Sequence, residues 1–209
     1  MMYKPVLNQS DVRIADQKTV YQGFYQVQKL KLQHRLFQGG WSKLLHRELV
    51  VRLPAVAVLM YDVITDQVVL IEQFRVGAMA HEEGPWQLEM VAGMIDTLET
   101  PTQVAIRECK EESGAIIDET NLELVCQYLV SSGGSNETLA IYCAPVDASQ
   151  LGGVHGLPTE GEDIQVCVID RQALGQMLEQ GKLTNAATII AAQWLQQHYP
   201  RLQAQWGSI

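Results

Sequence analysis

The segment "GMIDTLETPTQVAIRECKEESGA", residues 93–115, joins an apolar stretch to a dense run of charged residues. Its helix start is well marked, because Thr100 is a suitable N-cap, Pro101 suits the first helical position and Gln103 completes a capping-box spacing. Glycine commonly ends a helix in the left-handed conformation, and Gly114 stands in that place. The segment therefore predicts a helix that begins at about Pro101 and ends just before Gly114.

Three carboxylates gather on one side of this helix. At 100° per residue, Glu108, Glu111 and Glu112 fall within about 80–100° of its circumference. Ala105 and Cys109 occupy the neighbouring face and are expected to pack on a sheet, which places Glu112 at the wetter edge between the two faces. Like charges at this spacing destabilise a bare helix by only a few tenths of a kcal/mol. Taken alone, the cluster favours a solvated surface face over a metal site.

The composition is that of a soluble globular protein with a core. Of 209 residues, 47% are hydrophobic and 19% are charged, and the net charge is −9, so no nucleic-acid partner is expected. No apolar run approaches the ~20 residues that span a bilayer, and the N-terminus lacks a secretory signal, so no membrane partner is expected. The four cysteines stand far apart, which favours small buried thiols in a reducing cytoplasm over a zinc site.

The N-terminal part of the chain has a strand pattern. Polar and apolar residues alternate over residues 19–36, which predicts antiparallel strands. The glycines of "FQGGWSK" (37–43) mark a turn, after which "LLHRELVVRL" (44–53) resumes the pattern. These features predict a small antiparallel β-domain over residues 1–52. Such a sheet is marginal alone and needs a packing partner, which favours a homodimer.

Residues 53–209 are predicted to form a second domain. Residues 55–76, "AVAVLMYDVITDQVVLIEQFRV", form two apolar runs around Thr65-Asp66-Gln67, which predicts a hairpin. The other predicted elements are strands at 86–93, 122–130, 137–146 and 162–169 and helices at 171–182 and 185–199. Strands flanked by helices in this order indicate a layered α/β (α+β) domain. The expected core residues of the last two helices are Met177, Leu178, Ile189, Ile190, Trp194 and Leu195.

The opening segment resembles the signature of the Nudix hydrolase family. Gly93 precedes Glu99 by six residues, and Glu99 precedes the start of the run "RECKEESG" (107–114) by eight. Every charged and glycine position of the signature is present, and the departures are Cys109 and Ala115 at two aliphatic positions. Both replacements are small and apolar, so they affect packing and leave the charged chemistry intact.

The resemblance implies a metal site and reverses the preference for a solvated face. It implies Mg²⁺, with Mn²⁺ as a substitute, bound by the side chains of Glu108, Glu112 and Glu162 and the backbone carbonyl of Ala92. Mg²⁺ prefers oxygen ligands, and two close ions can hold phosphate oxygens and lower the pKa of a bound water. Glutamates on one helix at this spacing are therefore a suitable rigid ligand set.

The resemblance also assigns catalytic roles. It implies such roles for Arg107 and Glu111, and Arg107 is expected to hold Glu99 or a neighbouring carboxylate in position. Glu160, in the loop "TEGED" (159–163), matches the catalytic base of the family. Taken alone, this loop reads as an acidic surface loop; beside the helix it supplies the second half of the site.

A wider resemblance covers nearly the whole chain. The stretches from "FYQVQKLKLQHRLFQGG" (24–40) to "NAATIIAAQWLQ" (185–196) are similar to the bacterial ADP-ribose pyrophosphatases of this family. That similarity implies a Nudix α/β/α sandwich with a mixed sheet and a homodimer with swapped N-terminal domains. It implies Mg²⁺-dependent hydrolysis of ADP-ribose to AMP and ribose 5-phosphate. The implied substrate-binding residues are Phe24, Arg47 and Glu48 from one subunit and Arg75 and Met94 from the other.

One departure leaves the substrate open. The subgroup carries a proline in a loop that reads S-P-G-G, and Ser132 takes its place here. Residues 131–136 fit either a flexible substrate-side loop or an ordinary surface loop. Another nucleotide sugar, GDP-mannose or ADP-glucose, is the close alternative substrate. A non-catalytic ADP-ribose sensor is a further alternative of a different class.

Overall fold

The structure is a computed structural model that describes residues 3–96 and 98–207. The chain divides into two compact units, each described by itself. One unit contains Met1–Leu53 and Leu129–Thr138, and the other contains Pro54–Tyr128 and Leu139–Ile209. The first unit therefore includes a connecting segment from the middle of the chain as well as the N-terminal residues.

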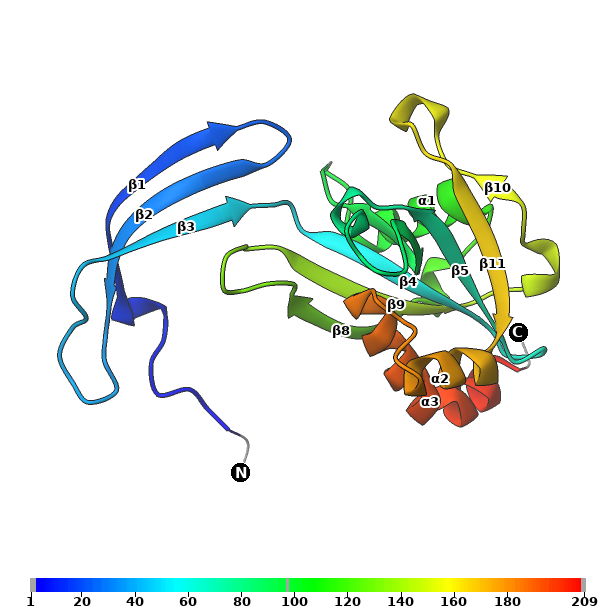
Figure 1. Cartoon of the computed structure of the whole chain (residues 1–209). Coiled ribbons are helices and arrows are strands. Elements are labelled where there is room, and N and C mark those ends of the chain that lie inside the picture. The colour runs from blue at the N-terminus through cyan, green and yellow to red at the C-terminus, as the bar shows by residue number, and fades with distance from the viewer. Residues whose placement is uncertain (1–2, 97, 208–209) are drawn as a thin grey trace. The chain divides into compact units, whose positions relative to one another are not determined.

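The first unit contains a three-stranded antiparallel sheet in the order β1-β2-β3. Its strands are β1 (Val12–Gln22), β2 (Gln26–His34) and β3 (Leu45–Val51), shown in blue and cyan in Figure 1. The predicted antiparallel strands are confirmed. Strand β1 begins at Val12, seven residues before the predicted start at Thr19. Every residue of β1 is exposed, so this strand contributes no buried face within the unit.

The connecting segment of the first unit is hydrogen-bonded to β3. The carbonyl of Gly134 accepts the N–H of Val50 at 2.8 Å. The side chain of Asn136 accepts the N–H of Arg52 at 2.7 Å. Residues 131–136 thus have a defined conformation beside β3, and Ser132 lies exposed within it.

The second unit contains an eight-stranded mixed sheet. Its central path is β10-β11-β5-β4-β9-β8, with β6 beside β5 and β7 beside β4. The strands are β4 (Ala55–Asp62), β5 (Gln67–Phe74), β6 (Trp86–Glu89), β7 (Val91–Met94), β8 (Glu123–Leu129), β9 (Thr138–Pro145), β10 (Val154–His155) and β11 (Ile164–Asp170). Because β4 runs parallel to β9 and antiparallel to β5, the predicted mixed sheet is confirmed.

Helices cover both faces of this sheet (Figure 1). The helices are α1 (Pro101–Ser113), α2 (Arg171–Glu179) and α3 (Ala186–Trp206), with short 3-10 helices η1 (Gln9–Asp11), η2 (Val76–Ala78), η3 (Glu119–Asn121), η4 (Ala148–Gln150) and η5 (Pro158–Glu160). Alternate residues of β4 enter two separate apolar cores, one with α1 and one with α2 and α3. The predicted α/β/α sandwich is therefore confirmed, and the core residues predicted for α2 and α3 belong to the second core.

Helix α1 has the caps that its sequence predicts. The Thr100 side chain accepts the N–H of Gln103, and the Gln103 side chain accepts the N–H of Thr100, so both halves of the capping box are present. Gly114 ends the helix with φ 74°, in the left-handed region that favours glycine. Local sequence thus fixes both ends of the helix that carries the carboxylates.

Two predicted elements differ from the structure. The stretch "WQLEMVAG" was predicted as one strand, but Met90 separates β6, which pairs with β5, from β7, which pairs with β4. The chain therefore changes its pairing partner at Met90, which interrupts the strand. Helix α3 continues through Pro200 to Trp206, although the predicted helix ends at Tyr199, because Leu202 and Trp206 are buried in the core. Across the described ranges, no helix is both long and apolar enough to cross a membrane.

The cysteines are free thiols in two environments. Cys109 and Cys143 are fully buried, as predicted for small hydrophobic side chains. Cys126 and Cys167 are only partly buried, which differs from the prediction that all four are buried. Burial raises the pKa of all four thiols, so they stay protonated near neutral pH.

Candidate active site

Glu112 is the most buried carboxylate of helix α1. It is only 3% exposed, and its Oε2 accepts the backbone N–H of Ala92 on β7 at 3.0 Å. The prediction that Glu112 lies at the wetter edge of the helix is therefore wrong. The reason is tertiary: β7 packs against this flank of α1 and presents a backbone donor that the helix sequence does not reveal.

Glu108 lies one turn earlier on the helix and packs against the backbone of β7. A Cβ atom added at Gly93 would overlap the carboxyl group of Glu108. Any other residue at position 93 would displace this side chain. Gly93 thus has a steric role, since the close approach of helix and strand needs a position without a side chain.

Arg107 contacts three carboxylates at once. Its Nε lies 3.2 Å from Glu99, and its Nη1 lies 3.0 Å from Glu108 and 2.8 Å from Glu111. Charge-assisted bonds of this kind fix the geometry of both partners. Arg107 was predicted to hold Glu99 or a neighbouring carboxylate. In the structure it contacts Glu99 and also Glu108 and Glu111.

The cluster carries more negative charge than its cationic neighbours neutralise. Burial raises the pKa of Glu112 to about 8, and the charges of Glu108 and Glu162 add to this rise despite the Ala92 N–H. Burial also raises the pKa of Glu108 to about 7, against the opposing effect of Arg107. A carboxyl group whose pKa lies this high favours its neutral form unless a cation comes near. The helix therefore presents an electrostatic environment that a divalent cation would complement.

A loop that follows β10 brings Glu162 to the same place. Its Oε2 accepts the N–H of Leu157 at 2.9 Å, and Gly156 donates its N–H to the carbonyl of Glu111 at 3.3 Å. Gly156 has φ 101°, and a Cβ there would approach the Cβ of Glu162 to 2.7 Å. The loop is thereby attached to the end of α1, and its glycine leaves room for the Glu162 side chain.

Glu160 lies on the same loop as Glu162, in a short helix. It ends the short helix η5, and its backbone N–H donates to the carbonyl of Leu157 at 2.9 Å. Its side chain is exposed and makes no hydrogen bond or ion pair with the residues that the structure describes. A solvated carboxylate on a surface loop keeps the freedom to reach a bound water.

The donor set fits a hard divalent cation by its chemistry. Three carboxylates and a backbone carbonyl supply only oxygen, which Mg²⁺ and Mn²⁺ accept. Among residues 3–96 and 98–207, however, no three His, Cys, Asp or Glu side chains are close enough together to enclose a metal ion. Negative charges repel, so carboxylates converge fully only around a cation. The predicted ligands Glu108, Glu112, Glu162 and Ala92 stay a prediction.

Comparison with known proteins decides the family. Residues 51–191 match the NUDIX domain, and this match covers more than half of the chain. The chain belongs to the NUDIX domain family. The family expected from the signature at residues 93–115 is therefore confirmed.

Several relatives of this NUDIX protein are similar over almost its full length. The ADP-ribose pyrophosphatase of Escherichia coli (strain K12) is 43% identical over 198 residues, which cover 95% of this chain and 94% of the relative. The ADP-ribose pyrophosphatase of Haemophilus influenzae (strain ATCC 51907 / DSM 11121 / KW20 / Rd) is 40% identical over 202 residues, which cover 95% of this chain and 92% of the relative. The GDP-mannose pyrophosphatase of Escherichia coli O1:K1 / APEC is more distant. It is 30% identical over 152 residues, which cover 72% of this chain and 77% of the relative.

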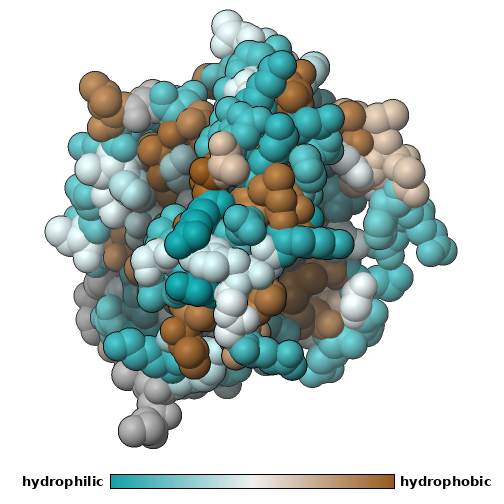
Figure 2. All heavy atoms as spheres, turned by 90° about the vertical axis from the view of Figure 1, so that its left-hand side faces the viewer, coloured by the Kyte–Doolittle hydropathy of each residue, from teal (hydrophilic) through white to brown (hydrophobic). Residues whose placement is uncertain are grey.

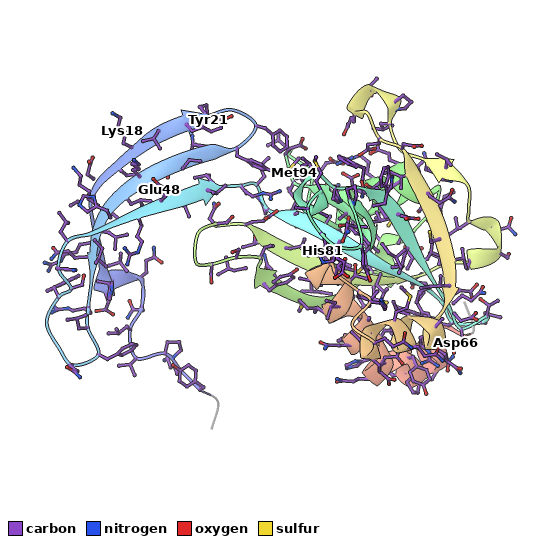
Figure 3. All side chains as sticks on the ribbon, viewed as in Figure 1. Lys18, Tyr21, Glu48, Asp66, His81 and Met94 are labelled. Atoms are coloured by element: carbon purple, nitrogen blue, oxygen red, sulfur yellow. The ribbon has the colours of Figure 1, made fainter. Side chains whose placement is uncertain are left out.

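Two of the predicted substrate-binding residues of the NUDIX protein lie in the second unit. Arg75 follows β5, and its Nε and Nη2 both lie 2.8 Å from Oε2 of Glu89. Its charge also acts on Glu112, whose pKa it lowers in part, so the guanidinium lies near the carboxylate helix. Met94 ends β7 opposite Ala55 and is labelled in Figure 3. Both residues therefore flank the carboxylates that α1 and β7 bring together.

The other three predicted substrate-binding residues lie in the first unit. Phe24 is 78% exposed and packs edge-on against Tyr25, with ring centroids 4.9 Å apart. Arg47 on β3 is exposed and donates to the carbonyl of His46 at 2.8 Å. Glu48, labelled in Figure 3, forms an exposed ion pair of 3.6 Å with Lys29. An exposed aromatic ring is suited to stacking on a planar ligand, and the binding roles of these three residues stay predictions.

The sequence reasoning missed two residues that shape the site. Glu89 is 6% exposed and holds Arg75, and its signal was a charged residue inside the apolar run "WQLEMVAG". A charge in such a run is costly unless it is paired, so it predicts a buried partner. Gly156 had no predicted role, because its contact with Glu162 depends on the folded path of the chain.

Proposed function

We propose that this protein is a metal-dependent hydrolase that cleaves the pyrophosphate of ADP-ribose to AMP and ribose 5-phosphate. The observation that carries the proposal is a pair of carboxylates on the signature helix, Glu112 buried and Glu108 partly buried, both with raised pKa values. The chain that holds them is 43% identical over 95% of its length to an ADP-ribose pyrophosphatase. The raised pKa values of this pair support a cation site at that helix. Burial without a cation would favour neutral side chains at both positions.

The metal in this proposal is Mg²⁺, with Mn²⁺ as a substitute. Its ligands are Glu108, Glu112 and Glu162 together with the backbone carbonyl of Ala92. When bound, such an ion neutralises the charge of the pyrophosphate and lowers the pKa of a bound water. The N–H of Ala92 on Glu112 and the N–H of Leu157 on Glu162 orient two of these carboxylates, which supports the assignment.

Arg107, Glu111 and Glu160 complete the proposed catalytic residues. Arg107 keeps Glu108 and Glu111 in fixed positions through its contacts of 3.0 Å and 2.8 Å. Glu160 accepts the proton of the attacking water, and the exposure of its side chain supports this role, because a solvated carboxylate can approach the substrate. The reaction consumes one water and releases two phosphate monoesters.

The proposal includes a homodimer in which both subunits contribute to one site. Residues 1–52 would form the swapped dimerisation domain and residues 53–209 the hydrolase domain. Phe24, Arg47 and Glu48 of one subunit would then contact the substrate with Arg75 and Met94 of the other. Light scattering on the full chain tests this arrangement: the mass of a dimer is expected, and the mass of a monomer at micromolar concentration would contradict it.

The exposed apolar surface of the first unit supports the dimer. Large exposed apolar side chains follow β1 and the turn after it: Val12, Ile14, Val20, Tyr21 and Phe24. Figure 2 shows apolar side chains, in brown, among polar ones on the face in view. These exposed apolar groups lie on one strand and the turn after it, where a second subunit could bury them. The free thiols support a reducing compartment, and we place the protein in the cytoplasm.

A second nucleotide sugar is the alternative substrate. Ser132 stands where the subgroup carries a proline, and a GDP-mannose pyrophosphatase is 30% identical over 72% of this chain. GDP-mannose and ADP-glucose therefore belong in the test. The charges of the signature helix are all present, which argues against a non-catalytic ADP-ribose sensor.

A substrate panel tests the proposed function. Purified full-length protein with Mg²⁺ is given ADP-ribose, ADP-glucose and GDP-mannose, and product release is measured for each. The expected result is the highest kcat/KM for ADP-ribose and no turnover when the metal is removed with a chelator. Preference for GDP-mannose would overturn the substrate, and turnover that survives metal removal would overturn the mechanism.

A further inference from the structure

Glu89 is a buried carboxylate with both of its oxygens engaged. Its Oε2 accepts the Nε–H of Arg75 at 2.8 Å, and Nη2 of the same guanidinium lies 2.8 Å from that oxygen. Its Oε1 accepts Nδ2 of Asn185 at 3.0 Å. Because the residue is only 6% exposed and is held from two sides, its carboxylate has one orientation.

Asn185 uses both ends of its amide. Its Oδ1 caps helix α3 by accepting the N–H of Thr188 at 3.0 Å. The orientation of the amide follows from this contact, since a backbone N–H can only donate and the oxygen must face it. The Nδ2 group is thereby directed to Glu89. One side chain thus joins the start of a C-terminal helix to the strand that holds Arg75.

The connection between α2 and α3 makes two further contacts with the same part of the sheet. Lys182 lies 3.1 Å from the carboxylate of Glu83 in the segment before β6. The hydroxyl of Thr184 donates to the side chain of Gln87 on β6. These contacts fix the start of α3 to β6, so the Asn185 amide cannot move independently of Glu89.

Arg75 needs such support if it binds a phosphate group. Its side chain is 44% exposed, and a free arginine would lose considerable rotamer freedom when it binds a ligand. The contact with Glu89 uses the Nε edge of the guanidinium and leaves Nη1 directed away from this pair. Fixing the side chain before binding lowers the entropic cost of the complex.

We propose that Asn185 is a positioning residue for substrate binding, which acts through Glu89 to hold Arg75 ready for a phosphate of the substrate. This inference rests on the proposed function, in which Arg75 contacts the substrate. Asn185 itself touches neither the substrate nor the metal. Its effect is therefore confined to the affinity for the anionic substrate, and the chemical step does not depend on it.

Asn185→Ser isolates the proposed contact. Serine keeps an oxygen that caps the helix and removes the amide donor, so the thermal midpoint is expected to stay near that of wild type. The KM for ADP-ribose is expected to rise about three- to tenfold with kcat unchanged, which is less than the loss of a direct hydrogen bond to a charged group because Asn185 acts on the substrate only through Glu89 and Arg75. Asn185→Ala also removes the cap and is expected to lower the thermal midpoint with the same rise in KM. Asp147→Ala, which removes the cap of η4, is the control and is expected to leave KM unchanged.

A double-mutant cycle separates this inference from the proposed function. Arg75→Lys is expected to raise KM, and Asn185→Ser is expected to add little in that background because both changes act on one contact. Equal KM for Arg75→Lys and wild type would overturn the proposed role of Arg75. If Arg75→Lys raises KM but Asn185→Ser does not, only the positioning role is overturned. A full additive effect in the double variant would overturn it as well.

Discussion

Acidic side chains lie near both ends of strand β4, and their pKa values shift in opposite directions. At the start of the strand, Ala55 pairs with Met94 on β7, the strand whose backbone contacts Glu112. At its end lie Asp62 and, in the following turn, Asp66. Figure 3 labels Met94 and Asp66 toward opposite ends of the sheet. The two ends differ in how much hydrogen-bond support the folded chain gives to a buried or partly buried carboxylate.

Asp62 has donors on both oxygens. Its Oδ1 accepts the N–H groups of Ile64 and Thr65 at 2.8 Å and 3.0 Å, and its Oδ2 accepts the N–H of Ala148 at 3.0 Å. Burial alone would raise the pKa of Asp62, but these backbone hydrogen bonds outweigh it and hold the pKa below its usual value. The charge is therefore stabilised in the folded state, and it ties a turn to a segment 86 positions away in the sequence.

Asp66 is paired with a buried arginine. Arg171 contacts its two oxygens at 2.7 Å and 2.8 Å, and Tyr61 donates its hydroxyl at 2.7 Å. Burial again raises the pKa of Asp66, but the bonds from Arg171 and Tyr61 exceed this effect, and the net pKa is lowered. A bidentate pair of this kind fixes the turn against α2.

The carboxylates of α1 lack comparable support. Glu112 receives one backbone N–H, and Glu108 shares Arg107 with two other acids. Burial and mutual repulsion therefore leave the pKa of Glu112 at about 8 and that of Glu108 at about 7. Local destabilisation of this kind is retained where function uses it. The difference between the two ends is therefore one of hydrogen-bond support: donors lower the pKa of Asp62 and Asp66 despite burial, and the pKa values of Glu108 and Glu112 rise where such donors are few.

The largest expected effect comes from neutralising Glu112, a carboxylate of α1 with few hydrogen-bond donors. Glu112→Gln keeps an oxygen for the Ala92 N–H but removes the charge that would hold the cation. We expect kcat/KM for ADP-ribose to fall about a hundredfold or more. The raised pKa of Glu112 makes its ionisation easier in the unfolded chain than in the folded protein, which lowers stability at neutral pH, and glutamine does not titrate, so the metal-free variant should unfold at a higher temperature than metal-free wild type. Steady-state kinetics at saturating Mg²⁺ and thermal unfolding in a chelator measure the two effects, and unchanged kinetics would contradict the metal-site proposal.

Neutralising Asp62, at the other end of β4, should lower stability and leave activity unchanged. Asp62→Asn replaces an oxygen acceptor by an amide group, so at least one of the three N–H groups loses its partner. We expect the free energy of unfolding to fall by about 2 kcal/mol, with kcat of the remaining folded protein unchanged. Denaturant unfolding measures the loss. A variant as stable as wild type would remove the contrast between the two ends of β4.

The sequence specifies α1 well because its determinants are local. Thr100 and Gln103 make the capping box and Gly114 ends the helix, so neighbours in the chain suffice to set both limits. The burial of Glu112 could not be predicted in the same way, since its donor comes from β7, 20 residues away in the sequence. The family signature identified the helix as special without showing which of its acids lies inside.

The remaining differences have the same cause. The run "WQLEMVAG" has the composition of one strand, and only the sheet order shows that its halves pair with β5 and β4. Pro200 is a local signal to end a helix, but the burial of Leu202 and Trp206 outweighs it. The partners of Asp62 and Asp66 also come from distant segments. Residues whose environment is set by tertiary contacts lie beyond local pattern reading.

A smaller effect is expected from the loop that carries Glu162. Gly156→Ala adds a Cβ that would lie 2.7 Å from the Cβ of Glu162, at a backbone φ of 101°. The side chain must shift, so we expect kcat/KM to fall about tenfold. Gly153→Ala is a suitable control because it also has positive φ but no atom within 4 Å of the added Cβ. Similar losses of activity in both variants would attribute the effect to backbone strain alone and not to Glu162.

The smallest expected effect is the loss of the stability contributed by Asp62 at low pH. The pKa of Asp62 is lower in the folded protein than in the unfolded chain, so the unfolded state binds more protons at low pH. The contribution of Asp62 is therefore fully present above about pH 4 and is lost as the pH falls through the lowered pKa. Denaturant midpoints measured from about pH 5 down to about pH 2 should fall more steeply for wild type than for Asp62→Asn, which lacks the titrating group. Parallel curves would mean that Asp62 gains no charge stabilisation from its three N–H donors, and the contrast with Glu112 would then rest on burial alone.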